Sequence, residues 1–165
     1  MQSKGETVLA IDPGFDRVGV AVLSEKNGNA ILLYSECIET KPKDKREKRL
    51  LMIGSRIDVV IKEWGPSVLA IETLFFNANA TSALGVAEAR GVITFQAMRA
   101  GLKVFEYSPQ AVKIAVTGYG KADKVSVENM VQKLVKVPEI KTKRLDDELD
   151  AIAVGITHLA TQKGI

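Results

Sequence analysis

The chain has 165 residues, a hydrophobic content of 46% and a formal net charge of +3, which fit one globular domain with a buried core. A charge this close to zero allows a nucleic-acid partner without requiring one. The single cysteine, Cys37, and the single histidine, His158, exclude an internal disulfide and a zinc site built from several histidine and cysteine ligands.

The first feature along the chain is a pair of predicted strands. Residues 8–11 form an apolar run that ends in one carboxylate, Asp12, and a Pro-Gly turn follows. A second run rich in valine ends near Leu23, so the two runs predict paired strands with Asp12 at the rim of a sheet. An aspartate at a turn commonly hydrogen-bonds its own backbone, so Asp12 alone does not define a site.

A third strand and a helix follow. Residues 30–38 predict a strand antiparallel to the second. Residues 41–49 hold six basic and two acidic side chains, which favours the solvated start of a helix over a contact with DNA. The helix itself is predicted from Leu50 to the Gly-Pro pair at residue 65, because apolar residues recur at three- and four-residue steps. These residues are Leu50, Ile53, Ile57, Val60, Ile61 and Trp64.

Residues 67–72 repeat the pattern of the first strand, because an apolar run again ends in a carboxylate, Glu72. A helix between two strands implies a crossover, so we expect this strand to lie parallel to the first, with both carboxyl ends on one edge. That arrangement brings Glu72 near Asp12. Two carboxylates at neighbouring strand ends are hard to explain by solvation alone.

An alanine-rich helix is expected from about residue 80 to residue 100. Three small residues, Ser82, Gly85 and Ala89, form a stripe along it. Such a stripe lets another helix approach closely, so it is a candidate dimer interface. Packing inside the chain's own core explains it equally well.

The rest of the chain predicts one short strand and three helices. The strand covers residues 103–107, and Ser108-Pro109 has the cap-then-proline pattern of a helix start. Further helices are expected at about 124–135 and 145–161, separated by a basic linker at 138–144. The residues predicted to face inward are Val127, Met130, Val131, Leu134, Leu149, Ile152, Ile156 and Leu159.

The order of these elements predicts an α/β fold: a mixed five-stranded sheet, whose first three strands are antiparallel, flanked by helices on both faces. No stretch approaches the roughly 18 uninterrupted apolar residues of a membrane span. The charged N-terminal residues also lack the apolar run of a secretory signal. We therefore expect a cytoplasmic protein.

The last predicted helix opens with four acidic residues within positions 146–150. Acidic side chains in a first turn complement the helix dipole, which accounts for one or two of them. Asp147 and Asp150 are three residues apart and share a face. If that helix lies on the sheet, the pair can meet Asp12 and Glu72.

Four carboxylates that converge without a neutralising arginine or lysine repel one another. Divalent cations such as Mg²⁺ and Mn²⁺ relieve the repulsion, since they prefer oxygen ligands and bridge carboxylates to phosphate. Two such ions about 4 Å apart can activate a water and stabilise the leaving oxygen of a phosphodiester. The sequence therefore indicates metal-dependent phosphoryl chemistry.

A series of motifs, in order over nearly the whole chain, resembles the RuvC family of Holliday junction resolvases. They are Ile11-Asp12-Pro13-Gly14 with Gly19, Ile71-Glu72 followed by Phe75, Ala89-Arg90-Gly91, Tyr107-Ser108-Pro109, Gly118-Tyr119-Gly120-Lys121-Ala122-Asp123-Lys124, and Asp147-Glu148-Leu149-Asp150-Ala151-Ile152-Ala153. The resemblance implies a single RNase H-like nuclease domain over residues 1–165. It also implies a homodimer that nicks two opposed strands of a four-way DNA junction in recombination and repair. It further implies two Mg²⁺ ions per active site, for which Mn²⁺ can substitute, and a branch-migration helicase complex of the RuvA–RuvB type as partner.

The resemblance also assigns roles to residues. Asp12, Glu72, Asp147 and Asp150 fall on the family's four catalytic, metal-binding positions. The third position is the least uniform in the family, and Asp146 and Glu148 lie close by as alternatives to Asp147.

Four further residues are candidates for DNA contact. Phe75 matches the position to which base stacking is attributed, a contact worth roughly 1–3 kcal/mol per base. Lys121 and Lys124 border a flexible Gly-rich turn at a helix start, where lysines and backbone amides suit phosphate. Arg90 is expected either to bind phosphate or to pair with an acidic neighbour.

Two other function classes remain. One is a junction-binding module without catalysis, which the presence of all four acidic positions disfavours. The other is a fragment of an actin-like or sugar-kinase-like ATPase, which also places Asp and Gly after a first strand. Such ATPases enclose the nucleotide with a second, duplicated domain, which 165 residues cannot supply.

Overall fold

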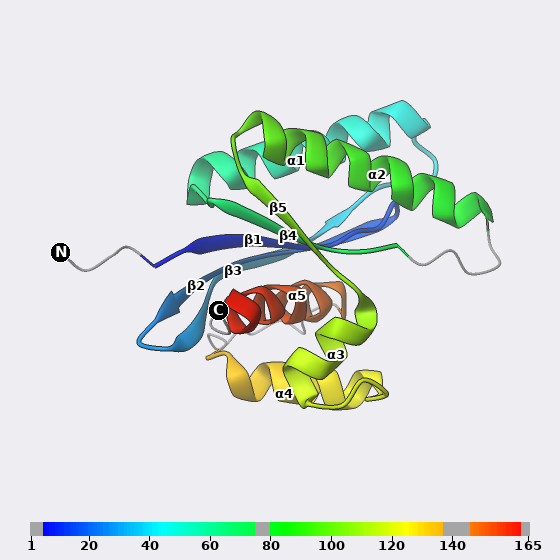
Figure 1. Ribbon diagram of the computed structural model, residues 1–165. Coiled ribbons are helices and arrows are strands. Elements are labelled where there is room, and N and C mark those ends of the chain that lie inside the picture. The colour runs from blue at the N-terminus through cyan, green and yellow to red at the C-terminus, as the bar shows by residue number, and fades with distance from the viewer. Residues whose placement is uncertain (1–4, 75–79, 137–145, 163–165) are drawn as a thin grey trace.

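The structure is a computed structural model that describes residues 5–74, 80–136 and 146–162 (Figure 1). It contains one sheet and helices on each side of it. The strands are β1 (Thr7–Asp12), β2 (Arg17–Lys26), β3 (Asn29–Glu39), β4 (Val68–Glu72) and β5 (Lys103–Tyr107). The helices are α1 (Arg46–Trp64), α2 (Ala80–Arg99), α3 (Pro109–Thr117), α4 (Lys124–Leu134) and α5 (Asp146–Gln162).

The five strands form one mixed sheet in the order β3-β2-β1-β4-β5. β1 pairs with β2 and β2 with β3 in the antiparallel sense, whereas β4 runs parallel to β1 and β5 parallel to β4. This confirms the predicted sheet and the crossover between the first and fourth strands. Because β1 and β4 are parallel, Asp12 and Glu72 end neighbouring strands at the same edge.

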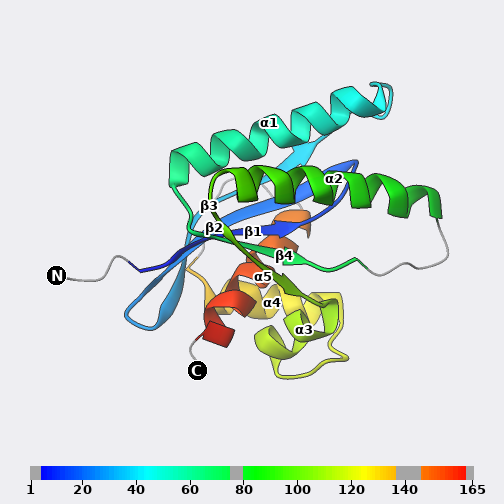
Figure 2. The same ribbon diagram turned by 45° about the horizontal axis from the view of Figure 1, so that its top comes forward.

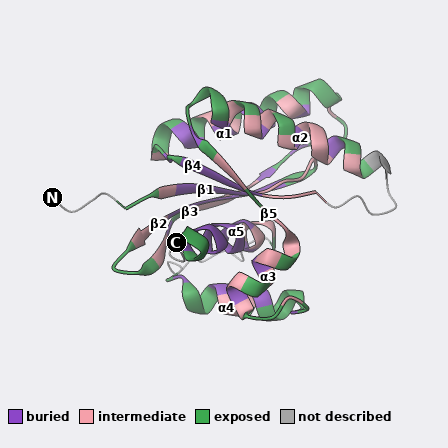
Figure 3. Cartoon of the chain, in the orientation of Figure 1, coloured by how far each residue is buried: buried purple, intermediate pink, exposed green. Residues whose placement is uncertain are grey.

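Helices cover both faces of the sheet, as the sequence predicts. α1 and α2 lie on one face, and α3, α4 and α5 lie on the other (Figures 1 and 2). Each face has its own core: one joins the sheet to α1 and α2, and the other joins it to the three remaining helices. Burial follows this layering, with buried residues concentrated in the central strands and in α5 (Figure 3).

Helix α1 begins at Arg46, four residues before the predicted start at Leu50. The basic run is a helix start, as favoured from the sequence, but its last residue is not solvated: Arg49 is only 8% exposed. The Arg49 guanidinium lies 3.7 Å from the centre of the Phe15 ring and pairs with Asp16. Its Nε donates to Thr40 Oγ1 at 2.9 Å. Arg49 therefore fixes the turn that follows β1.

The predicted inward faces are largely confirmed, with one correction. The α5 residues predicted to face inward are all buried, as are Val127 and Val131 of α4. The prediction for Leu134 is wrong: its side chain is 44% exposed, because it is the last residue of α4. The predicted basic linker at 138–144 lies outside the described residues.

The single cysteine and the single histidine both pack within the fold. Burial, followed by the charge of Asp147, raises the pKa of the Cys37 thiol to about 11, so the thiol stays protonated at neutral pH. His158 is fully buried, and its Nδ1 lies 2.8 Å from the Tyr107 hydroxyl. Among the described residues, no helix combines the length and the apolar character that crossing a membrane requires.

Candidate active site

Two glycines allow α5 to lie very close to the sheet. A Cβ at Gly19, on β2, would lie 1.9 Å from the carbonyl oxygen of Asp147. A Cβ at Gly155, within α5, would lie 2.3 Å from Leu23 Cδ1. At Gly19 the obstacle is backbone, so this position requires glycine, whereas at Gly155 a larger residue would have to displace the buried Leu23 side chain. The acidic start of α5 is thereby held against the edge where β1 ends.

Three of the four predicted carboxylates converge at this edge. Asp12 from β1 and the pair Asp147 and Asp150 from α5 each offer an oxygen, and these atoms all lie within 4.8 Å of one another. Glu72 is outside that group, but it lines the same cavity as Asp12 and Asp150, with a volume of about 250 Å³. The structure thus brings Asp12, Asp147 and Asp150 together, as expected from the strand end and the helix spacing. Glu72 lies in the same cavity but outside the group of oxygens.

The carboxylates of this edge are difficult to ionise together. Burial raises the pKa of Asp12 to about 8, and the charges of Glu72, Asp150 and Asp147 add to that rise. Burial also raises the pKa of Glu72 to about 7, with a further contribution from Asp150. Acids held so close and so poorly solvated gain most from a bound cation. An oxygen-only donor set of this kind fits Mg²⁺ or Mn²⁺.

Two basic side chains lie beside these acids. Lys124 Nζ lies 3.4 Å from Asp150 Oδ2 and 3.7 Å from Asp146 Oδ2. Arg17 Nε lies 3.1 Å from Asp147 Oδ2. The protein therefore supplies part of the balancing charge from its own side chains at the rim of the cluster.

Sequence reasoning missed two basic residues of the site, Arg17 and Lys113. Lys113 lines the cavity, and its charge lowers the pKa of Glu72 against the larger effect of burial. A signal for each was present in the sequence. Arg17 is two residues before Gly19 on the same strand and so shares its face. Lys113 is one helical turn beyond Pro109, which lines the cavity too.

The alternatives for the third carboxylate occupy different surroundings. Asp146 is 61% exposed and contacts Lys124 at the rim. Glu148 accepts a hydrogen bond from Ser35 Oγ at 2.8 Å, on the side of β3. Only Asp147, of these three acids, joins the group of oxygens with Asp12 and Asp150.

The candidate DNA contacts have different outcomes. Phe75 lies outside the described residues. Arg90 forms an ion pair with Glu106, which is the second of the two roles expected for it. Lys121 is exposed and lines a separate surface cavity of about 460 Å³ beside Tyr119 and Ser126.

The start of α4 is capped by the protein itself. Asp123 Oδ1 accepts a hydrogen bond from the Ser126 amide at 2.8 Å. One of the backbone amides expected to suit phosphate is therefore already occupied, while the side chains of Lys121 and Lys124 remain on the surface.

The fold and the carboxylate edge define a protein of the RNase H-like class. A family model described as "Crossover junction endodeoxyribonuclease RuvC" matches residues 8–158. The chain therefore belongs to the RuvC family of crossover junction endodeoxyribonucleases.

Individual relatives agree with this membership. The chain is 40% identical over 151 residues to the RuvC of Desulfitobacterium hafniense, covering 92% of this chain and 90% of that protein. It is 38% identical over 160 residues to the RuvC of Caldicellulosiruptor saccharolyticus, covering 96% and 95%. Both alignments cover at least 90% of each protein.

Solved structures show the same fold. The structure of Thermus thermophilus RuvC in complex with a Holliday junction substrate matches with a TM-score of 0.89 and 31% identity, covering 96% of each chain. The yeast mitochondrial Holliday junction resolvase Ydc2 matches with a TM-score of 0.69 and 15% identity, covering 96% of this chain and 80% of that one. At that identity the second match supports the fold alone.

Proposed function

We propose that this protein resolves four-way DNA junctions by nicking two opposed strands, with divalent cations held by Asp12, Glu72, Asp147 and Asp150. Membership of the RuvC family makes it a junction-resolving endonuclease. The observation that supports this particular site is the convergence of three carboxylate oxygens within 4.8 Å of one another at the strand edge. Mg²⁺ is the proposed ion and Mn²⁺ its substitute, because both prefer clusters of carboxylate oxygens.

The bound ions would supply Lewis-acid activation of a water and stabilisation of the leaving oxygen. The chain's own residues would orient the DNA around them. Lys113 and Lys124 line the same cavity, where their ammonium groups can hold the phosphates beside the scissile bond. In this proposal Lys124 exchanges its contact with Asp150 for a phosphate when DNA arrives.

Contacts farther from the scissile phosphate are proposed for three other residues. Lys121, exposed beside the start of α4, would bind a phosphate of a junction arm. Phe75, three residues after Glu72, would stack on an unpaired base. Arg90 would reach phosphate only by leaving Glu106, with which it pairs in the free protein.

A homodimer is proposed because the substrate presents two equivalent strands and a two-fold pair of sites can cut both. The predicted stripe at Ser82, Gly85 and Ala89 is not its best surface. Ala89 is fully buried, and a Cβ at Gly85 would lie 2.9 Å from Phe15 Cδ1, so both face the chain's own core. A better surface is the outer face of α2, where three large apolar side chains are more than half exposed. They are Leu84, Phe95 and Met98, at 57%, 62% and 59%.

Two further proposals complete this assignment. Residues 1–165 are proposed to act as one nuclease domain, since both cores of the described residues share a single sheet. A branch-migration helicase complex of the RuvA–RuvB type is proposed as the partner that delivers the junction.

The test of this function is a cleavage assay on two substrates of matched sequence. Purified protein is incubated in Mg²⁺ with a synthetic four-way junction and with a linear duplex made from the same arms. The proposal expects paired nicks in opposed strands of the junction and no comparable cutting of the duplex. Tight binding to the junction without any nicking would favour a binding module without catalysis.

A further inference from the structure

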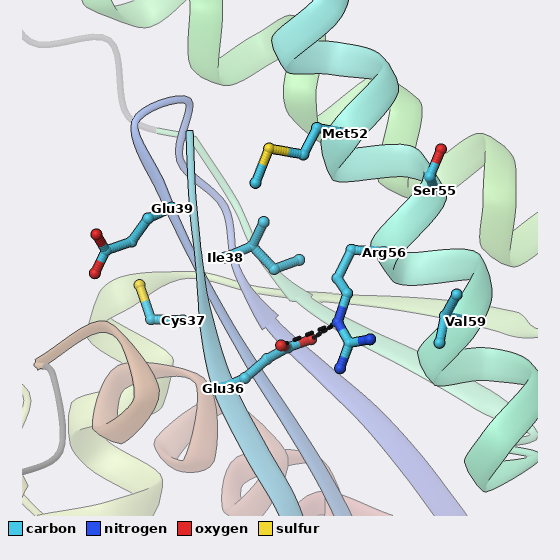
Figure 4. Close-up of a pocket in the computed structure, with 8 residues that line it drawn as sticks. All are labelled: Glu36, Cys37, Ile38, Glu39, Met52, Ser55, Arg56 and Val59. Atoms are coloured by element: carbon cyan, nitrogen blue, oxygen red, sulfur yellow. Dashed lines mark hydrogen bonds and ion pairs between the residues drawn. The ribbon is translucent and has the colours of Figure 1, made fainter. Parts of the chain in front are cut away.

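A second hollow, separate from the active-site cavity, lies between β3 and α1 (Figure 4). It has a volume of about 440 Å³ and contains none of the four carboxylates of the active site. Ile38 forms part of its wall on the strand side, and Met52 and Val59 form the helix side. None of the residues proposed above to hold metal or to contact DNA lines it.

The strand beside the groove is the outermost strand of the sheet. β3 pairs with β2 on one side, and on its other side the described residues contribute no strand. An edge strand presents backbone N–H and C=O groups that another extended chain can pair with. The backbone groups at this edge of β3 therefore favour an extended chain over a helix or a small apolar molecule, neither of which pairs with them as a strand does.

Helix α1 keeps apolar side chains partly exposed on the side of the groove opposite β3. Met52, Arg56 and Val59 are spaced at four and three residues, so they share one face of the helix. Met52 and Val59 are 43% and 45% exposed, while Ile53 and Ile57 on the adjoining face are fully buried against the sheet. A strand added beside β3 would place alternate side chains under Met52 and Val59 and cover both.

The charges around the strand indicate what such a segment would carry. Figure 4 shows Ile38 and Glu36 on the side of β3 that faces α1, and Cys37 and Glu39 on the opposite side. Glu36 is already paired with Arg56, at 2.8 Å. Glu39 is exposed and has no ion-pair partner within the part of the chain that the structure describes. A residue opposite Glu39 on an added strand would be a direct cross-strand neighbour, where a basic side chain is favoured.

The same charges disfavour two other occupants. In a two-fold antiparallel pairing of β3 with β3 of a second copy, centred on Glu36 or on Glu39, that acid would lie opposite its own counterpart, and like charges opposite each other are destabilising. A nucleic-acid backbone would meet the Glu39 carboxylate with like charge as well.

We propose that the groove between β3 and α1 binds an extended peptide segment of a partner protein, which adds to the sheet as a sixth strand. Its main chain pairs with the free edge of β3. Alternate side chains are apolar and fill the space under Met52 and Val59, and those between them include a basic residue opposite Glu39. This mode of recognition takes its affinity from main-chain hydrogen bonds and its specificity from pockets for alternate side chains.

The proposal is tested with three labelled peptides of equal length and fluorescence anisotropy. The first alternates valine with lysine. The second has the same sequence but is N-methylated at alternate backbone nitrogens, so it keeps the charge and the apolar surface and cannot pair as a strand. The third alternates valine with glutamate. We expect binding of the first peptide, weakened about tenfold or more by N-methylation and by the exchange to glutamate.

Variants of the protein locate the binding. Val59→Asp places a charge in the groove and should weaken the first peptide's binding about tenfold. Leu51→Asp is the matched control, because Leu51 is 70% exposed on α1 and does not line the groove. Thermal melts of both variants confirm that they fold, and Met52→Asp replaces Val59→Asp if the latter does not. Hydrogen exchange supports the proposal if the β3 amides become protected when the first peptide is added and not when either of the other two is added.

Three outcomes would overturn the proposal. The first is equal binding of the lysine peptide and its N-methylated form, which would show charge attraction without strand pairing. The second is no binding of the lysine peptide at millimolar concentration. The third is conversion of a dimer into a monomer by Val59→Asp in sedimentation, which would assign the groove to a second copy of this chain.

Discussion

Arg17 and Asp147 form an ion pair across the rim of the carboxylate cluster, with 3.1 Å between Arg17 Nε and Asp147 Oδ2. The arginine side chain is 54% exposed and the aspartate 20%. Asp147 Oδ2 is buried and accepts no hydrogen bond from the described residues, so the arginine acts on it through charge more than through a directed bond. Arg17 is thus a counter-ion that a metal bound at Asp147 would have to replace.

Arg17→Ala is therefore expected to tighten metal binding. Removing one positive charge from this distance should lower the dissociation constant for Mn²⁺ about three- to tenfold, given the partial exposure of the pair. Calorimetric titration of the DNA-free protein measures this directly. Arg99→Ala is the matched control, since Arg99 is similarly exposed and contacts Asp58 outside the site. Unchanged or weaker Mn²⁺ binding in Arg17→Ala would contradict the counter-ion role.

The raised pKa of Asp12 predicts that ionisation of the site costs stability. Folding raises this pKa from 3.8 to about 8, so the folded state binds more protons than the unfolded state between these values. The stabilisation is fully present below about pH 4 and is lost as pH rises through about 8. Asp12→Asn, which cannot ionise, should therefore be more stable than the wild type at high pH.

The measurement is thermal unfolding in a chelating buffer from pH 5 to pH 9. We expect Asp12→Asn to melt at a higher temperature than the wild type, by a margin that grows with pH. The corresponding difference in the free energy of unfolding should reach on the order of 1–3 kcal/mol at pH 9. Saturating Mg²⁺ should shrink this margin, because it stabilises the ionised wild type alone. A margin independent of pH would show that Asp12 titrates normally.

The third carboxylate is tested by three neighbouring substitutions. Asp147→Asn should reduce the rate of junction cleavage roughly a thousandfold, as expected when several kcal/mol of metal-ion stabilisation are lost. Asp146→Asn and Glu148→Gln should change it less than about tenfold, because these acids contact Lys124 and Ser35 instead. Single-turnover cleavage in Mg²⁺ measures all three. A larger loss in either neighbour than in Asp147→Asn would move the site by one residue.

The sequence was informative about this site where local rules apply. A crossover makes β1 and β4 parallel, so Asp12 and Glu72 had to end at one edge. Which acid of α5 points inward depends instead on the rotation of that helix, which is fixed by the contact of Gly19 with the Asp147 backbone. That contact joins residues far apart in the chain, and no local pattern encodes it.

For the same reason, the contacts of Arg49 and Arg17 were not predicted. Arg49 belongs to a charge run that is solvated elsewhere, and its burial follows from the position of Phe15 in the turn after β1. Arg17 stays 54% exposed at the start of β2 and gains its partner, Asp147, only because α5 packs beside that strand. Tertiary packing gave both arginines their partners, whereas Ser108 could be predicted as a cap and indeed accepts a hydrogen bond from the Ala111 amide at 3.1 Å.

The dimer proposal predicts the effect of a charge on the outer face of α2. Phe95 is 62% exposed, so Phe95→Glu should leave the fold intact and convert a dimer into a monomer at micromolar concentration. Sedimentation velocity distinguishes the two states. Leu51→Glu serves as control, because Leu51 is exposed to a similar degree on α1. A wild-type monomer, or a Phe95→Glu dimer as stable as the wild type, would exclude this face.

The most direct test of the metal site compares wild type and Asp12→Asn on a synthetic four-way junction in Mg²⁺, with nicking and binding measured in parallel. Asp12 belongs both to the group of converging oxygens and to the cavity lining, as does Asp150. Replacing it removes a ligand and a repulsive charge at once, so nicking should be lost while junction binding persists or tightens. If Asp12→Asn cuts the junction at the wild-type rate, the four carboxylates are not the catalytic site.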